Sequence, residues 1–349
     1  MATLESLQEI LDFVLNHRRS QERTQHLQLL VSTVSKTFIP QVFDDRLFSL
    51  AQLVSREIKA ESSDVFLLLK LHQIVSISLF TDAEEFVKQT LPELQWLALR
   101  NPSGPWSYSA FQCIAVGLAY AIEDEDVNIN VLQWVSKFPP LINFPNDGPI
   151  LVFSSLAITV PESCVYAIEP LCRDLHRYNV NLQFAASTFI GILAEHLISQ
   201  HRSELIPLIC VESINEMLAD PNRRIPKEDR LTKKRHLMSV LETIQSHSSP
   251  SESIVVEGSS LNLTSWSQLF TYLLLKNVYE GTTHHHLAFN DVLRDAFGLP
   301  PRSISLAEKL DVAEVSKKTK VAQRKEVVKE KKTQRRKDRS KKVHDEDFD

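Results

Sequence analysis

The stretch from Asn181 to Ser199, NLQFAASTFIGILAEHLIS, shows most clearly which fold the sequence specifies. Its apolar residues recur at helical spacing, so they share one face of an α-helix. That face carries Leu182, Ala185, Ala186, Phe189, Leu193 and Leu197. An apolar stripe of this kind is typical of a helix that packs against neighbouring helices. We therefore expect a helix here, in a core built from helices.

The same periodicity continues over most of the chain. Prolines such as Pro40, Pro105 and Pro161 fall between the periodic segments, where they end one helix before the next begins. Helix pairs that repeat at intervals of roughly 40 residues without a strict consensus are typical of HEAT or armadillo arrays. A compact irregular helical domain is the alternative. Candidate helices span residues 4–16, 25–38, 42–59, 63–80, 83–99, 107–122, 128–137, 149–160, 164–177, 181–199, 203–219 and 229–246.

The composition agrees with this pattern. Only 7 of the 349 residues are glycine, well below the typical share of ~7%. Leu, Ala, Glu, Gln and Lys, which favour helices, are frequent instead. The predicted fold class is all-α, an armadillo/HEAT-like α-solenoid with a small C-terminal helical unit and a long basic C-terminal helix or tail.

Three parts can be distinguished along the chain. Residues 1–247 form the helical array. Residues 248–301 begin with a Ser-rich segment, typical of a linker or packed loop, and continue with helices near 265–279 and 288–297. Residues 302–349 form a basic arm with an acidic end. The arm has no Gly or Pro from 305 to 342, so on an anionic partner we expect it to form a helix of about 55 Å, frayed when alone.

The net charge of −5 hides a strong internal polarity. Between Val315 and Val343 the sequence has 14 Lys and Arg against 3 Asp and Glu, a net charge of +11. The last six residues add 4 acids, which leaves −12 on residues 1–314. The chain is therefore an acidic body with a basic arm.

Motifs of enzyme chemistry are absent from the sequence. The glycines are widely separated, which excludes a P-loop, a GxGxxG turn and a GxSxG elbow. There is no HExxH motif, and adjacent His284, His285 and His286 cannot all face one ion, so a packed or solvated helix start explains them better than a metal site. We expect no enzyme activity, cofactor, metal or small-molecule substrate. A catalytic triad assembled only in space is the alternative.

Four cysteines occur singly in apolar segments, without metal-ligand spacing. They are Cys113, Cys164, Cys172 and Cys210. This pattern predicts reduced, buried thiols in a cytosolic or nuclear protein. The most apolar stretch, from Phe66 to Phe80, is interrupted by polar residues and is shorter than the ~20 residues of a membrane span. We expect a buried helix there and no membrane association.

Two basic clusters carry the remaining chemistry. The first contains Arg223, Arg224, Lys227, Arg230, Lys233, Lys234 and Arg235, around the start of a predicted helix. The second is the arm, with Lys317, Lys318, Lys320, Arg324, Lys325, Lys329, Lys331, Lys332, Arg335, Arg336, Lys337, Arg339, Lys341 and Lys342. About 14 cations along a linear element match the charge spacing of a phosphate chain, which favours RNA binding without base readout. A solvated helix face explains the first cluster equally well, and a solubilising tail or nuclear import signal is the alternative for the arm.

The C-terminal half resembles the interferon-related developmental regulator family. The similarity covers about residues 180–349, through VNLQFAASTFIGILAE, KEDRLTKKRHLMSVLETI, PSESI, HLAFNDVLRDAF, RRKDRSKK and the final DEDFD. Upstream of residue 180, the sequence shows only a helical periodicity that is compatible with the family. The residues that match family motifs, to which we assign mainly structural roles, are Trp266, His286, Leu287, Asn290, Leu293, Arg294 and Phe297.

The resemblance implies an armadillo/HEAT-like fold without catalysis, and a protein associated with non-translating ribosomes. Its helical body is then expected to occupy tRNA sites on the small subunit, with the basic C-terminal helix in the mRNA channel. Expected partners are rRNA and proteins of the small ribosomal subunit, with contacts to the large subunit as a further option.

The alternative function is a nuclear transcriptional co-regulator scaffold that binds protein partners on its concave face. The family also includes members described in this way. The first function predicts a cytoplasmic protein, and the alternative predicts a nuclear one.

Overall fold

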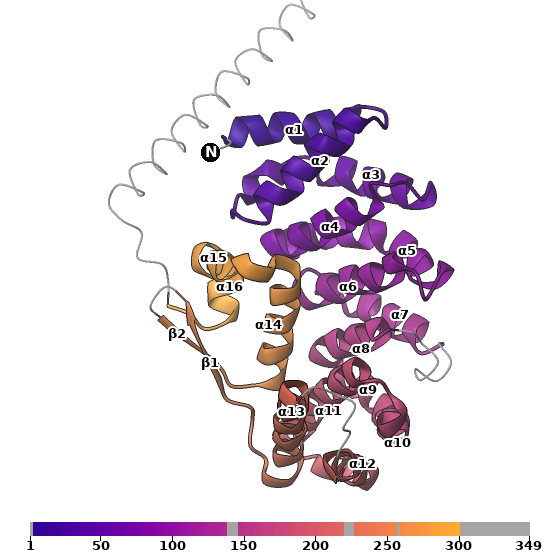
Figure 1. The fold of residues 1–349 in the computed structure, drawn as a ribbon, viewed down its shortest axis with the longest axis vertical. Helices are drawn as coiled ribbons and strands as arrows, with labels where there is room; N and C mark the ends of the chain where they lie inside the picture. The colour runs from indigo at the N-terminus through magenta and orange to yellow at the C-terminus, as the bar shows by residue number, and fades with distance from the viewer. Residues whose placement is uncertain (1–2, 138–145, 220–226, 257–258, 301–349) are drawn as a thin grey trace, which may run out of the picture. The chain divides into compact units, whose positions relative to one another are not determined.

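The computed structural model describes residues 3–137, 146–219, 227–256 and 259–300 of the chain. In this part, helices α1 to α12 are stacked side by side, and one two-stranded sheet is present (Figure 1). The predicted all-α solenoid is confirmed, whereas its assignment to the armadillo/HEAT class stays a prediction. The α-helices are α1 (Leu4–Asn16), α2 (Gln21–Val34), α3 (Leu47–Lys59), α4 (Val65–Leu79), α5 (Glu84–Arg100), α6 (Pro105–Tyr120), α7 (Glu125–Val135), α8 (Gly148–Thr159), α9 (Pro161–Cys164), α10 (Ile168–Asp174), α11 (Val180–Ser199), α12 (Leu208–Ala219), α13 (Lys227–Ser246), α14 (Trp266–Tyr279), α15 (Thr283–Phe289) and α16 (Asp291–Ala296).

Side-chain caps determine where several of these helices begin. Thr3, Ser20 and Asn179 each accept a hydrogen bond from the backbone amide three residues further on, at the starts of α1, α2 and α11. Such caps satisfy amides that have no partner within the helix. The helix expected over residues 25–38 therefore begins earlier, at Gln21, because Ser20 caps it.

The segment after α13 is a β-hairpin, where the sequence favoured a linker or packed loop. Strand β1 (Glu252–Val256) pairs antiparallel with β2 (Ser259–Leu263), with Ile254 opposite Leu261. Leu261 and Leu263 are buried, and the residue between them is exposed. This alternation is the period-two signal of a strand that covers a core on one face.

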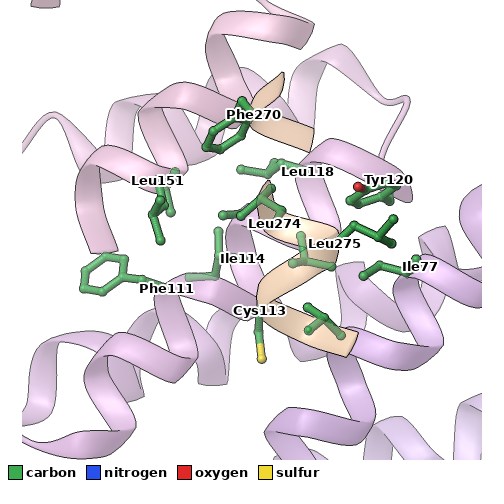
Figure 2. Close-up of a cluster of buried hydrophobic side chains, with 14 of the residues drawn as sticks. Ile77, Phe111, Cys113, Ile114, Leu118, Tyr120, Leu151, Phe270, Leu274 and Leu275 are labelled. Atoms are coloured by element: carbon green, nitrogen blue, oxygen red, sulfur yellow. The ribbon is translucent and has the colours of Figure 1, made fainter. Parts of the chain in front are cut away.

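Helix α14 lies across the stack and completes its hydrophobic core. Phe270, Leu274 and Leu275 of α14 are buried among side chains of α4, α6 and α8 (Figure 2). The Tyr120 hydroxyl of α6 donates a hydrogen bond to the Thr271 carbonyl at 2.6 Å. The C-terminal segment is thus part of the core of the stack, and residues 1–300 form one compact unit. The domain boundaries expected at residues 247 and 301 stay predictions.

Two helical stretches are long and apolar enough to cross a membrane, namely Val65–Arg100 and α11. Their most apolar windows are 61% and 67% buried inside the protein, respectively. Helices that form the core of a helical stack are apolar around most of their circumference for this reason.

Two of the four cysteines correct the sequence-based expectation of free thiols. Cys172 of α10 and Cys210 of α12 are joined by a disulfide, with their Cα atoms 5.1 Å apart. Cys113 and Cys164 are free and buried, as expected. The two bonded cysteines are 38 positions apart in the sequence, and helix packing alone brings them together.

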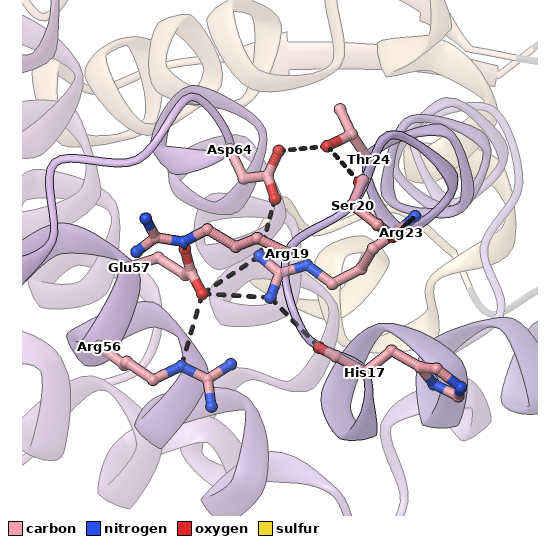
Figure 3. Close-up of polar contacts among 8 residues, drawn as sticks. All are labelled: His17, Arg19, Ser20, Arg23, Thr24, Arg56, Glu57 and Asp64. Carbon is pink, nitrogen blue, oxygen red and sulfur yellow. Dashed lines mark hydrogen bonds and ion pairs between the residues drawn. The ribbon is translucent and has the colours of Figure 1, made fainter.

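A buried ion cluster holds the first helices together. The Arg23 guanidinium of α2 donates to Glu57 Oε1 at 3.1 Å and to Asp64 Oδ2 at 2.7 Å (Figure 3). All three side chains are at most 2% exposed. Arg19 donates to the second Glu57 oxygen at 2.7 Å, and the Thr24 hydroxyl donates to Asp64 Oδ1 at 2.7 Å. Both carboxylates are therefore paired and hydrogen-bonded, which burial of a charge requires.

Candidate nucleic-acid interface

Helix α13 carries the first predicted basic cluster and is held by its apolar face. Leu237, Val240 and Thr243 are buried where α13 packs against α11 and α12. Their spacing of three residues puts them on the inner face of the helix. The opposite face of α13 is therefore the one that a partner can reach.

The structure separates the cations of this cluster by exposure. Lys234 and Arg235 are exposed, and Arg230 is half-buried. Lys233 is only 8% exposed, because it precedes Leu237 by one helical turn on the inner face. In this conformation Lys233 presents little surface to a ligand, and its role in RNA binding stays a prediction. Arg223, Arg224, the Lys227 side chain and every cation of the arm lie outside the described residues.

The exposed face of α13 also carries apolar side chains. Leu231 is 45% exposed and Met238 is 42% exposed, and they flank Lys234 at helical spacing. The exposure of these two residues could not be predicted from the sequence, because the surrounding charges mask them in the composition. The accessible surface of α13 therefore combines two exposed cations with apolar contact area.

Trp266 anchors α13 to α14 and α11. Its indole Nε1 donates to the Thr243 hydroxyl of α13 at 2.9 Å, and its backbone amide donates to Glu195 Oε2 of α11 at 2.8 Å. The ring is fully buried against Gly191, where an added Cβ would lie 2.6 Å from a ring atom. This junction fixes the position of α13, and with it the two exposed cations.

Gly191→Ala tests this close approach. We expect the substitution to lower the free energy of unfolding by about 1–3 kcal/mol, because the added methyl group overpacks against a ring that cannot move aside. Urea denaturation followed by circular dichroism measures the change. In a Trp266→Leu background the smaller side chain leaves space for the added methyl group. The loss in free energy of unfolding caused by Gly191→Ala should then fall to less than half. Equal costs in both backgrounds would contradict the proposed contact.

The other residues that match family motifs are also in the interior. Leu287 and Leu293 are fully buried, and Phe297 is 5% exposed. The Asn290 side chain caps α16, and the Arg294 guanidinium donates to the carbonyl oxygens of Ala288 and Pro300. The motif therefore organises the end of the described chain and presents no surface for a ligand.

His286 illustrates how the histidine run is used. Its Nε2 donates to the Ser35 carbonyl at 3.0 Å, and its ring stacks on Tyr279 with centroids 3.5 Å apart. Burial lowers the pKa of His286 to about 4, so the ring is neutral at physiological pH. Among the described residues, no group of three or more His, Cys, Asp or Glu side chains is arranged to hold a metal ion.

The comparisons with known proteins address the family directly. Residues 2–137 match the family model described as Interferon-related developmental regulator (IFRD). Over these residues, the chain is similar to the interferon-related developmental regulator family. The predicted resemblance to this family is confirmed, on a segment where the sequence alone shows only the periodicity of helices. The motifs at residues 180–349 lie outside the matched segment and stay a resemblance.

Interferon-related developmental regulator 2 from Mus musculus is 28% identical over 142 residues. The alignment covers 40% of this chain and 32% of the mouse protein, so it spans about a third of that relative. A solved structure titled as that of an engineered protein has 14% sequence identity and a TM-score of 0.41, covering 70% of this chain and 100% of its own. This score is too low to support a conclusion about the fold.

Proposed function

We propose that this chain, which is similar to the interferon-related developmental regulator family, binds ribosomes and represses translation. In this proposal the helical body occupies tRNA sites of a non-translating ribosome. The basic arm lies in the mRNA channel, where it excludes mRNA by overlap. The partners are rRNA and proteins of the small subunit, and the expected location is the cytoplasm.

The observation that carries the proposal is the separation of charge along the chain. Residues 315–343 carry a net charge of +11, whereas residues 1–314 carry −12. An acidic body is repelled by RNA, so attachment requires concentrated cations elsewhere. A linear element with cations on all sides suits a channel lined by phosphate groups. The family match and the exposed Lys234 and Arg235 on α13 also support the proposal.

Sucrose-gradient sedimentation of cell extract tests attachment. At low salt we expect the full-length chain to migrate with small subunits or whole ribosomes, and a variant lacking residues 315–349 to stay near the top. The logarithm of the binding constant should fall with the logarithm of the salt concentration by about 0.7–0.9 per phosphate contact. Even about 6 contacts would weaken binding by orders of magnitude over a modest salt range.

Matched variants separate charge from chain length. Changing the arm lysines to arginine keeps the charge and should keep co-migration, whereas changing them to glutamine should abolish it. On α13, Lys234→Gln with Arg235→Gln should make the slope of log binding constant against log salt shallower, by the amount that corresponds to at most two phosphate contacts. Lys36→Gln with Lys276→Gln removes two exposed lysines outside both clusters and serves as the control. A full-length chain that stays at the top of a low-salt gradient contradicts the proposal.

One observation bears on the alternative of a nuclear scaffold. That function requires an open inner face on the helical stack, with apolar side chains available to a protein partner. In the described part of the chain, α14 covers α4, α6 and α8 with its own apolar side chains (Figure 2). We therefore give priority to the ribosome-binding function.

A further inference from the structure

An open groove lies beside the exposed face of α13. Its volume is about 760 Å³, and it runs between α13 and α14 as far as α6, α8 and α11. Leu151, Phe270 and Leu274 line it. They belong to the cluster of buried apolar side chains drawn in Figure 2. These three side chains are at most 9% exposed and belong to the core, so this part of the lining is rigid.

Aromatic rings form one wall of the groove. Phe184 of α11 and His236 of α13 are both half-buried, with ring centroids 4.9 Å apart. His236 Nε2 lies 3.2 Å from the Thr188 hydroxyl, which holds the ring in place. Burial lowers the pKa of His236 to about 4, so the wall is uncharged at physiological pH. Uncharged rings of this kind are platforms on which a planar ligand can stack.

Three polar side chains along the groove have no hydrogen-bond or ion-pair partner among the described residues. Asn181 of α11, Asn277 of α14 and Arg235 of α13 line it, and none forms a side-chain hydrogen bond or ion pair with another described residue. A carboxamide offers donors and an acceptor at once, and a guanidinium offers donors to an anion. The free groups therefore suit a ligand with a hydrogen-bonding edge and a negative charge.

Two carboxyl groups also line the groove. Glu252 of β1 is exposed, and Asp147, before α8, is half-buried. Burial raises the pKa of Asp147 above its ordinary value. Carboxylates accept hydrogen bonds from exocyclic amino groups of bases. They also repel phosphate, which leaves Arg235 as the place for a negative charge.

We propose that this groove binds a nucleotide of single-stranded RNA, with the base against Phe184, its edge at Asn181 and Asn277, and a phosphate at Arg235. Stacking and carboxamide contacts are the usual means by which proteins hold unpaired bases. The inference rests on the proposed function for its ligand class. It adds a site that contacts bases, whereas the arm contacts only phosphates.

The test uses the full chain and a single-stranded tetraribonucleotide that contains 4-thiouridine. Binding is measured at about 0.5 M salt, where electrostatic attachment to the arm is strongly screened and stacking persists. Asn181→Asp with Asn277→Asp keeps side-chain size but replaces the amide donors with acceptors. We expect this variant to bind about tenfold more weakly. Ultraviolet crosslinks of the unchanged protein should map to peptides that contain Phe184 or His236.

A control variant introduces the same charges elsewhere. Asn130→Asp with Asn262→Asp adds two carboxylates at exposed positions outside the groove and should leave oligonucleotide affinity unchanged. Equal affinity of the groove variant and this control overturns the inference, as do crosslinks confined to the arm. Crosslinks from the groove to a protein instead of RNA in cell extract overturn it in favour of a peptide site.

Gradient sedimentation of the same variants keeps the two proposals separate. If the groove variant loses oligonucleotide affinity but still migrates with ribosomes, the groove is confirmed as an RNA site that is not required for ribosome binding. If the full-length chain does not migrate with ribosomes but crosslinks to the oligonucleotide through the groove, the ribosome proposal fails and the groove stands.

Discussion

Trp266→Ala is expected to lower the free energy of unfolding by about 3–5 kcal/mol, among the largest effects of any single substitution in this chain. The indole is fully buried, so the change leaves a cavity between α11, α13 and α14. It also leaves the buried Thr243 hydroxyl without the indole donor, although that hydroxyl still donates to the Ser248 carbonyl at 2.7 Å. Urea denaturation followed by circular dichroism gives the change in stability.

Trp96→Ala is the matched control for this measurement. Trp96 is 41% exposed and its ring lies under the Arg100 guanidinium, so its removal exposes little new surface. We expect a loss below about 1 kcal/mol. Equal losses for the two substitutions would contradict the central role assigned to Trp266.

Arg23→Met should destabilise the chain by about 3–5 kcal/mol as well. The substitution keeps an unbranched side chain but leaves Glu57 and Asp64 buried without their shared counter-ion (Figure 3). Denaturant midpoints at pH 7 measure the effect. The triple variant R23M/E57Q/D64N removes all three buried charges, so it should recover part of the lost stability. A triple variant less stable than the single one would contradict this explanation.

Arg56 supplies the control for the ion cluster. Its Nε lies 3.4 Å from Glu57 Oε1, but its side chain is 58% exposed. Arg56→Met should therefore cost less than about 1 kcal/mol. Burial tends to raise the pKa of Glu57, but hydrogen bonds to its carboxylate and the charge of Arg23 outweigh this effect, and the net pKa is lowered. The stabilisation from Glu57 is thus present above its ordinary pKa and is lost as the pH falls through the lowered value.

The local structure was readable from the sequence because apolar spacing determines a helix without reference to the rest of the chain. The expected helix over 4–16 matches α1, and that over 181–199 differs from α11 by one residue. The prediction was less accurate at the end of the described chain. The single helix expected over residues 288–297 is divided at Asn290 into α15 and α16. There the cap of α16 interrupts the helical backbone.

Contacts between distant residues could not be predicted in the same way. The pairing of Arg23 with Asp64 and the bond between Cys172 and Cys210 depend on how helices stack, which no local spacing encodes. In the candidate interface, the cations of α13 could be predicted from the sequence, because they form a basic cluster. The inward direction of Lys233 follows from its register with Leu237, which the sequence contains but a count of charges ignores.

The position of α14 and α15 has a consequence for the order in which this chain folds as it is synthesised. The hydroxyl of Thr282 and the ring of His286 both donate to the Ser35 carbonyl, across 247 and 251 positions of sequence. The hydroxyl groups of Tyr279 and Ser78, which are 201 positions apart in the sequence, form a hydrogen bond. Helices α2 and α4 therefore leave the ribosome long before the residues that cover them. An apolar surface stays open until α14 and α15 have been synthesised, and the nascent chain requires protection from aggregation during that interval.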